Sequence, residues 1–201
     1  MFNKSLFFVL FVFSSLLSAE PLGYEKITPA QPTQNPDKVE VIEFFWYGCP
    51  HCYSFEPTLA EWLKNKPDNV EFIRIPAVFS KLWGDHAKAY FTAEALGVVD
   101  KVHADLFDAI QNKKQALRSE DDLAKFFVEH GVDETEFRNA YKSFLVDAKL
   151  RQAESMPPRY GVTGVPAIII NGKYKTNGPL AKSQKNMIKV MNELIAKESE
   201  Q

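Results

Sequence analysis

The segment Cys49-Pro50-His51-Cys52 contains the only two cysteines of the 201-residue chain. Two thiols separated by two residues at the start of a helix can close into a disulfide, and thiol–disulfide exchange can pass that disulfide to another protein. A strand predicted over 39–46 leads into the motif, and the segment 53–63 after it is predicted to be helical. Cys49 is therefore expected at a helix N-terminus, where unpaired backbone N–H groups and the helix dipole favour a thiolate.

The residue types inside the motif favour the same chemistry. Pro50 suits the first helical position, because its missing N–H has no partner there in any case. His51 places a polar donor beside the sulfur. We therefore predict that Cys49 is the nucleophilic thiolate and that Cys52, one turn further along, is the buried resolving thiol.

Other uses of a cysteine pair receive less support from the sequence. A zinc site needs further Cys or His ligands, but His86, His103 and His130 show no paired ligand spacing. A purely structural disulfide is disfavoured, because closing so short a loop removes little entropy from the unfolded chain. Copper handling is disfavoured by the absence of Met or His clusters near the pair. We expect a redox-active pair with no metal and no cofactor. A peptide-binding chaperone with incidental thiols remains an alternative.

The N-terminus has the parts of a secretory signal peptide. Lys4 precedes an apolar run over 6–17, which ends in the small residues Ser18-Ala19. The run is too short for a bilayer span of roughly 20 residues, although an uncleaved anchor is the alternative. We predict cleavage after Ala19, which exports the cysteine pair to a compartment where disulfides persist. The net charge of −2 gives no indication of a nucleic-acid partner.

The remaining pattern predicts strands at both ends of the chain and helices between them. Residues 20–37 are rich in proline and read as an extended leader, and a second strand is expected over 70–75. Strand signals return over 166–170, followed by the hairpin turn Asn171-Gly172 and a strand over 173–176. The order is βαβ, a helical insertion, then ββα.

Residues 84–155 are predicted to form the helical block. Ser119 and Asp133 each precede an acidic residue at the third following position, as in a capping box. One helix is expected to run on from Asp133, and a last amphipathic helix is expected over 180–195. The residues of the helix from Asp133 expected to face the core are Phe137, Ala140, Tyr141, Phe144, Leu145 and Ala148.

With the Cys-Pro-His-Cys motif at a strand-to-helix junction, a helical insertion and Gly164-Val165-Pro166 before a strand, the chain resembles the DsbA family of periplasmic thiol:disulfide oxidoreductases from about Val39 to Ala196. The resemblance implies an α/β fold, a thioredoxin fold with an inserted all-helical domain. Residues 20–83 and 156–201 would form the thioredoxin-like part, and 84–155 the insertion. Thioredoxins usually carry Gly-Pro between the cysteines, whereas Pro-His is typical of the DsbA family.

The resemblance also implies an activity and partners. The protein would sit in the periplasm and donate its Cys49–Cys52 disulfide to unfolded, newly exported proteins that have free cysteines. A DsbB-type, quinone-linked membrane oxidase would re-oxidise it. A disulfide isomerase or reductase is the alternative within the same fold. Dimeric isomerases of this superfamily carry a dimerisation domain ahead of the catalytic one, for which residues 20–37 are too short.

Further site residues follow from the resemblance. Pro166 matches a cis-proline that faces the active site, so the backbone of Val165 is expected to pair with an extended substrate strand. Glu43 matches an acidic residue beneath the site that assists proton transfer at the resolving cysteine. Arg74 matches a basic residue that family members often place near this acid. The alternative for Glu43 is that it reaches solvent at the edge of its strand, because a buried carboxylate is costly unless it is paired.

Four aromatic residues are candidates for a substrate-binding surface beside Cys49. Trp46, Tyr47, Phe79 and Trp83 could frame an apolar groove for unfolded chains, or all four could belong to the core. For Phe79 we expect the core.

Overall fold

A computed structural model describes residues 23–200, so the predicted signal peptide and its cleavage after Ala19 lie outside the described residues. These residues form a five-stranded mixed sheet with the order β1-β5-β4-β2-β3, in which only the β2–β3 pair is parallel. The strands are β1 (Glu25–Lys26), β2 (Val39–Phe45), β3 (Val70–Pro76), β4 (Ala167–Ile170) and β5 (Tyr174–Asn177).

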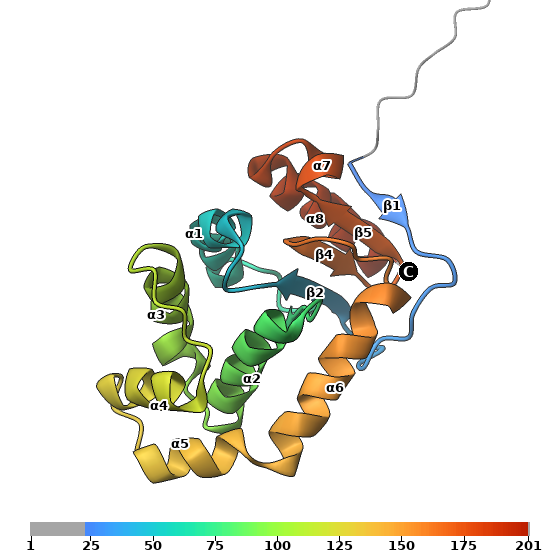
Figure 1. The fold of residues 1–201 in the computed structure, drawn as a ribbon. Helices are drawn as coiled ribbons and strands as arrows, with labels where there is room; N and C mark the ends of the chain where they lie inside the picture. The colour runs from blue at the N-terminus through green and yellow to red at the C-terminus, as the bar shows by residue number, and fades with distance from the viewer. Residues whose placement is uncertain (1–22, 201) are drawn as a thin grey trace, which may run out of the picture.

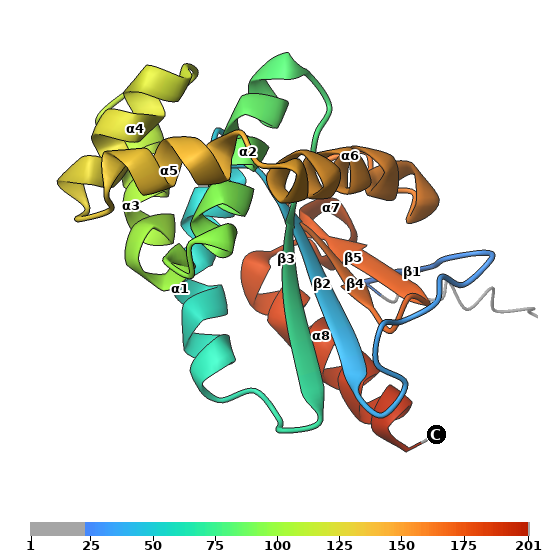
Figure 2. The same ribbon diagram turned by 90° about the horizontal axis from the view of Figure 1, so that it is seen from below.

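Strand β2 lies in the interior of the sheet, as its apolar residues on both faces predicted. All seven of its residues are buried, and it pairs with β3 on one side and β4 on the other. Helices α1 (Pro50–Lys64) and α8 (Gln184–Ser199) cover one face of the sheet, where Val41, Leu59 and Met191 belong to one hydrophobic cluster. Figure 2 shows these two helices beside the sheet, with α6 on the other side.

Five helices connect β3 to β4, where the sequence predicted a helical insertion. Figure 1 shows most of this block set apart from the strands, with α2 and α6 leading back toward the sheet. Ser119 and Asp133 cap α4 and α5 by accepting the backbone N–H of the third following residue, as predicted. The helices are α2 (Lys81–Ala95), α3 (Val99–Gln111), α4 (Glu120–Glu129), α5 (Glu134–Tyr141) and α6 (Phe144–Arg159).

The single helix predicted from Asp133 is wrong. The chain turns after Tyr141, and the Ser143 hydroxyl accepts the Val146 N–H to begin α6 as a separate helix. The new direction carries Phe144 and Leu145 away from the core, so their side chains are 81% and 54% exposed. The apolar stripe is continuous in the sequence, but the Ser143 cap gives the Val146 N–H a hydrogen-bond partner and so begins a second helix in a different direction.

The predicted extended leader over 20–37 contains the short strand β1, whose Glu25 carboxylate lies 3.0 Å from the Lys175 ammonium on β5. The expectation of one uninterrupted last helix needs correction. Leu180 belongs to a separate short helix, α7 (Gly178–Ala181). Lys182 then takes a positive φ of 65°, which ends α7 before α8 begins. Within residues 23–200, none of the helices combines the length and apolarity that crossing a bilayer requires.

Candidate active site

The Cys-Pro-His-Cys motif forms the junction between β2 and α1, as the sequence predicted. Cys49 is the N-cap of α1, with an extended backbone, and Pro50 is its first residue. The Cys49 N–H donates to the Trp46 carbonyl at 2.9 Å, which closes the turn after β2. The Cys52 N–H donates to the Cys49 Sγ at 3.4 Å, so the sulfur occupies the position of a capping oxygen.

The two sulfurs differ in access to solvent. Both cysteines are free thiols, and Cys49 retains 8% of its surface whereas Cys52 retains none. The Cys49 thiol donates to the carbonyl of Val165 at 3.4 Å, and the bond between Val165 and Pro166 is cis, as the resemblance implied. The loop before β4 and the start of α1 therefore meet at one sulfur.

The surroundings move the pKa values of the two thiols in opposite directions. The pKa of Cys49 falls to about 6, chiefly through the hydrogen bond from the Cys52 thiol, with smaller contributions from backbone N–H groups and His51. Burial raises the pKa of Cys52 well above its usual range, and the neighbouring Cys49 and the charge of Glu43 add to the increase. At neutral pH the accessible sulfur is thus the thiolate and the buried one the thiol.

Glu43 lies beneath the cysteines with its side chain wholly buried, which excludes the alternative that it reaches solvent. The Arg74 Nε donates to Glu43 Oε2 at 3.1 Å, so the predicted neighbour is present. The pKa of Glu43 is raised to about 8, chiefly by burial and then by the charge of Glu56, while Arg74 opposes the shift. The carboxyl group is therefore able to hold and release a proton near neutral pH.

Sequence reasoning missed two polar residues that complete this buried cluster, Glu56 and His103. The Arg74 Nη2 donates to Glu56 Oε2 at 3.1 Å, and His103 lies between Glu56 and the Tyr47 hydroxyl. The position of Glu56 was detectable, since it is four residues after Cys52 and shares its helical face. No comparable signal exists for His103, which comes from the helical insertion.

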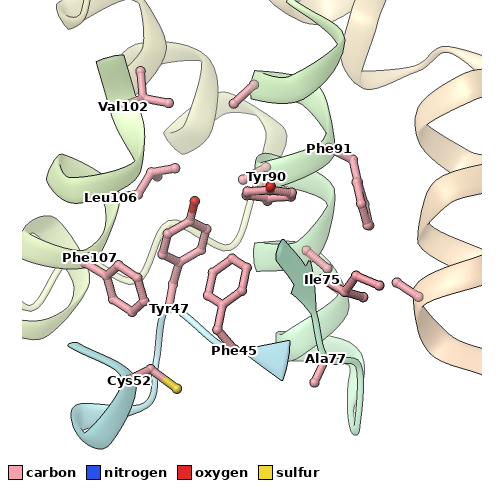
Figure 3. Packing of buried hydrophobic residues seen from close by; sticks show 14 of the residues in the cluster. Phe45, Tyr47, Cys52, Ile75, Ala77, Tyr90, Phe91, Val102, Leu106 and Phe107 are labelled. Atoms are coloured by element: carbon pink, nitrogen blue, oxygen red, sulfur yellow. The ribbon is translucent and has the colours of Figure 1, made fainter. Parts of the chain in front are cut away.

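Of the four aromatic candidates, three lie at or near the surface and one is core. The rings of Trp46 and Trp83 stack at 4.2 Å between centroids, and Phe79 packs on Trp83 at 5.0 Å. Phe79 is 43% exposed, so its predicted place in the core is wrong. Tyr47 is buried, with its ring between Phe107 and Phe45 and its hydroxyl directed away from Cys52 (Figure 3).

A groove of about 490 Å³ opens beside the motif. Its walls are His51, the loop 163–166, the segments 177–179 and 182–184, and Met187. Sequence reasoning found His51, Val165 and Pro166, but it missed the residues at the end of β5, in α7 and at the start of α8. The groove includes the backbone next to the Cys49 sulfur, so a chain bound there would lie within reach of it.

The DSBA-like thioredoxin domain family matches residues 73–189. The chain is 42% identical to the thiol:disulfide interchange protein DsbA of Pseudomonas syringae pv. tomato, over 92% of this chain and 88% of that protein. It belongs to the DsbA family. The crystal structure of Pseudomonas aeruginosa DsbA is similar in fold, with a TM-score of 0.85 and 37% identity over 88% of this chain and 92% of that one.

A further DsbA relative is known with a peptide. The structure of Proteus mirabilis DsbA with a non-covalently bound peptide has a TM-score of 0.76 and 30% identity, covering 89% of this chain and 98% of that one. Family membership confirms the predicted thioredoxin fold with a helical insertion. The chain is a DsbA-type thiol:disulfide oxidoreductase, and Cys49 and Cys52 are its only cysteines.

Proposed function

We propose that the protein works as a disulfide donor in the periplasm, oxidising cysteine pairs in newly exported proteins through a mixed disulfide at Cys49. The carrying observation is the asymmetry of the two sulfurs, with an accessible Cys49 whose pKa is lowered to about 6 and a buried Cys52 whose pKa is raised. A stabilised Cys49 thiolate favours the reduced form, so the oxidised protein tends to give its disulfide away.

The reaction runs in two exchange steps. A substrate thiolate attacks the Cys49 sulfur of the Cys49–Cys52 disulfide, forming a mixed disulfide and releasing the Cys52 sulfur with the electron pair of the broken bond. A second substrate thiolate then attacks the substrate sulfur of that mixed disulfide and releases Cys49 as a thiolate. The two substrate thiols lose two electrons and two protons in all. The protein takes up both electrons and ends with Cys52 as the thiol and Cys49 as the thiolate, so one proton stays on Cys52 and the other passes to solvent.

Glu43 would supply the proton that Cys52 takes up in the first step. Its burial and its raised pKa of about 8 support this role, since the group keeps a proton available near neutral pH. His51 and Pro50 act through the start of α1: Pro50 begins the helix, and the N–H and the charge of His51 both help to lower the pKa of Cys49.

Substrates would bind along the groove beside the motif. The backbone of Val165 would pair with an extended substrate segment, next to the cis Val165–Pro166 bond and the Cys49 sulfur. The Proteus mirabilis relative with its non-covalently bound peptide supports recognition of peptide segments. The walls of the groove combine Val165, Pro166 and Met187 with polar residues at the rim, which suits unfolded chains of mixed sequence.

The proposal includes a location and a partner. The predicted signal peptide over 1–19 supports export, and the absence of cysteines outside the motif suits a protein that transfers disulfides without being held together by them. Turnover then needs an external oxidant, for which we propose a DsbB-type, quinone-linked membrane oxidase. We also retain the division into a thioredoxin-like part (20–83 and 156–201) and an inserted helical part (84–155).

Disulfide transfer is tested by mixing the oxidised mature protein with a reduced, unfolded protein that has one pair of cysteines. We expect rapid loss of substrate thiols, and a Cys52→Ala variant should accumulate mixed disulfides that a Cys49→Ser variant does not form. Preferential rearrangement of scrambled disulfides would instead support an isomerase. Suppression of substrate aggregation that persists in a Cys49→Ser, Cys52→Ser variant without any thiol transfer would support a chaperone.

A further inference from the structure

His103 is a buried residue of the helical insertion whose two ring nitrogens both face the thioredoxin-like part. Its Nδ1 lies 2.8 Å from the Tyr47 hydroxyl, in the segment between β2 and α1. Its Nε2 lies 3.4 Å from Glu56 Oε1, on α1. The rings of Phe45 and Phe107 pack edge-on to it at 5.3 and 5.2 Å, so the orientation of the imidazole is held on both sides.

The surroundings select one tautomer of this imidazole. Burial lowers the pKa of His103 and raises that of Tyr47, so both groups are neutral near pH 7. A carboxylate can only accept hydrogen bonds, so the nitrogen that faces Glu56 carries the proton. The other nitrogen then accepts from the Tyr47 hydroxyl. The polarity runs in one direction, from the Tyr47 hydroxyl through a hydrogen bond to His103 Nδ1, and from His103 Nε2 through a 3.4 Å contact to Glu56 Oε1.

Glu56 and Glu43 share one cation. Arg74 donates its Nη2 to Glu56 and its Nε to Glu43, each at 3.1 Å. Among residues 23–200, the buried Oε1 atoms of both carboxyl groups and the facing His103 Nε2 make no hydrogen bond of good geometry. Two carboxylates around a single guanidinium repel each other, so one of them retains a proton. Arg74 contacts both carboxyl groups at the same distance, so it does not determine which of them keeps the proton.

We propose that His103 determines which carboxyl group keeps the proton. By directing its Nε2–H at Glu56, it keeps Glu56 as the carboxylate and leaves the proton on Glu43, the carboxyl group whose charge acts on Cys52. His103 is thus a positioning residue, acting through Glu56 and Arg74. The inference rests on the proposed role of Glu43 as the proton donor to Cys52. It assigns the helical insertion a part in the chemistry of the cysteine pair.

The opposite shifts of the two carboxyl groups agree with this assignment. Burial alone would raise the pKa of Glu56, but the ring N–H that His103 directs at it, followed by Arg74, lowers it. Among the described residues, Arg74 is the one donor to Glu43, and the pKa of Glu43 rises. The other titratable groups that act on this cluster come from several elements and are Tyr47 and Cys52 near the motif, Tyr90 on α2 and Asp100 on α3.

The test is a ¹³C NMR titration of the carboxyl carbons of Glu43 and Glu56 in the reduced full-length mature protein, with signals assigned through Glu43→Gln and Glu56→Gln. In the wild type we expect Glu43 to titrate above its ordinary range and Glu56 below it. In His103→Leu, which removes the donor, the pKa of Glu56 should rise and that of Glu43 should fall. His103→Gln restores an N–H donor and should return both values toward the wild type.

Two further variants separate this role from simple packing. Tyr47→Phe keeps the ring but removes the hydroxyl that donates to His103 Nδ1 and so holds the tautomer. It should shift the pKa values of Glu43 and Glu56 in the same directions as His103→Leu. This variant tests the proposal if the leucine variant does not fold. His130→Leu removes the imidazole that lies 3.2 Å from Asp105, elsewhere in the helical insertion, and should leave Glu43 and Glu56 unchanged.

Either of two results would overturn the proposal. One is unchanged titration of both carboxyl groups in a folded His103→Leu or Tyr47→Phe variant. The other is a ¹⁵N spectrum of the wild-type imidazole that places the proton on Nδ1. These measurements do not involve disulfide transfer, so a protein that fails to oxidise substrates would refute the proposed function and leave the assignment of the proton standing.

Discussion

Glu43 and Arg74 occupy matching positions on the parallel strands β2 and β3, and this register brings the Arg74 Nε within 3.1 Å of Glu43 Oε2. Side chains at paired positions of neighbouring strands project from the same face of the sheet. On that face, helix α1 supplies Cys52 and Glu56. The register therefore places one cation between the carboxyl groups of Glu43 and Glu56.

Replacing Arg74 by Met should destabilise the folded protein strongly. The Arg74 side chain is 15% exposed and that of Glu56, its ionised partner, is 16% exposed, and removing one partner of a buried ion pair costs about 3–5 kcal/mol. Urea unfolding at neutral pH measures the change. Lys64→Met is the matched control, because its ion pair with Glu61 is largely exposed, at 73% and 67%, and such pairs contribute little. Equal effects of the two substitutions would contradict the buried pairing.

The thiolate of Cys49 should titrate with a pKa of about 6 in the reduced protein, followed by its ultraviolet absorbance with the oxidised protein as blank. His51→Ala should raise this pKa slightly. Cys52→Ala should raise it more, because the Cys52 thiol is the largest stabilising contribution and His51 contributes less. A larger shift in His51→Ala than in Cys52→Ala would contradict this order.

Glu43 should make the reduced protein less stable as the pH rises. Its pKa is raised from an ordinary value of 4.5 to about 8 in the folded state. Between these values the unfolded chain releases the proton and the folded protein retains it, so the free energy of unfolding falls with increasing pH. The Gln side chain in Glu43→Gln stays neutral, so the variant should lack this pH-dependent contribution to the free energy of unfolding. The stability of the variant relative to wild type should therefore increase from pH 4.5 to 8, as measured by urea unfolding across that range. A constant difference would mean that Glu43 is ionised in the folded protein.

Replacing Gly48 by Ala should disturb the aromatic stack beside the motif. A Cβ at this position would overlap the ring of Trp46, which stacks on Trp83, and forced overpacking costs about 1–3 kcal/mol. We expect lower stability by thermal unfolding together with a changed tryptophan fluorescence. Gly164→Ala is the control on the other side of Cys49, where an added Cβ meets no atom within 4 Å. A Gly48→Ala variant as stable as this control would show that the ring moves without cost.

The sequence by itself determined the features that depend on neighbours along the chain. The N-cap position of Cys49, the first-turn proline at Pro50, and the caps at Ser119 and Asp133 follow from local hydrogen bonding and dihedral limits. The central place of β2 follows from its unbroken apolar composition. The pairing of Glu43 with Arg74 was implied by the family resemblance, and the register of β2 and β3 confirms it.

Only the tertiary structure decided which distant residues surround these elements. The exposure of Phe144 depends on the turn at Ser143, and the break at Lys182 shapes the groove beside Cys49. His103 meets Tyr47 across 56 residues of sequence. Such contacts arise because packing the helical insertion against the sheet buries polar groups, and a buried polar group must find its partners in space wherever they lie in the sequence.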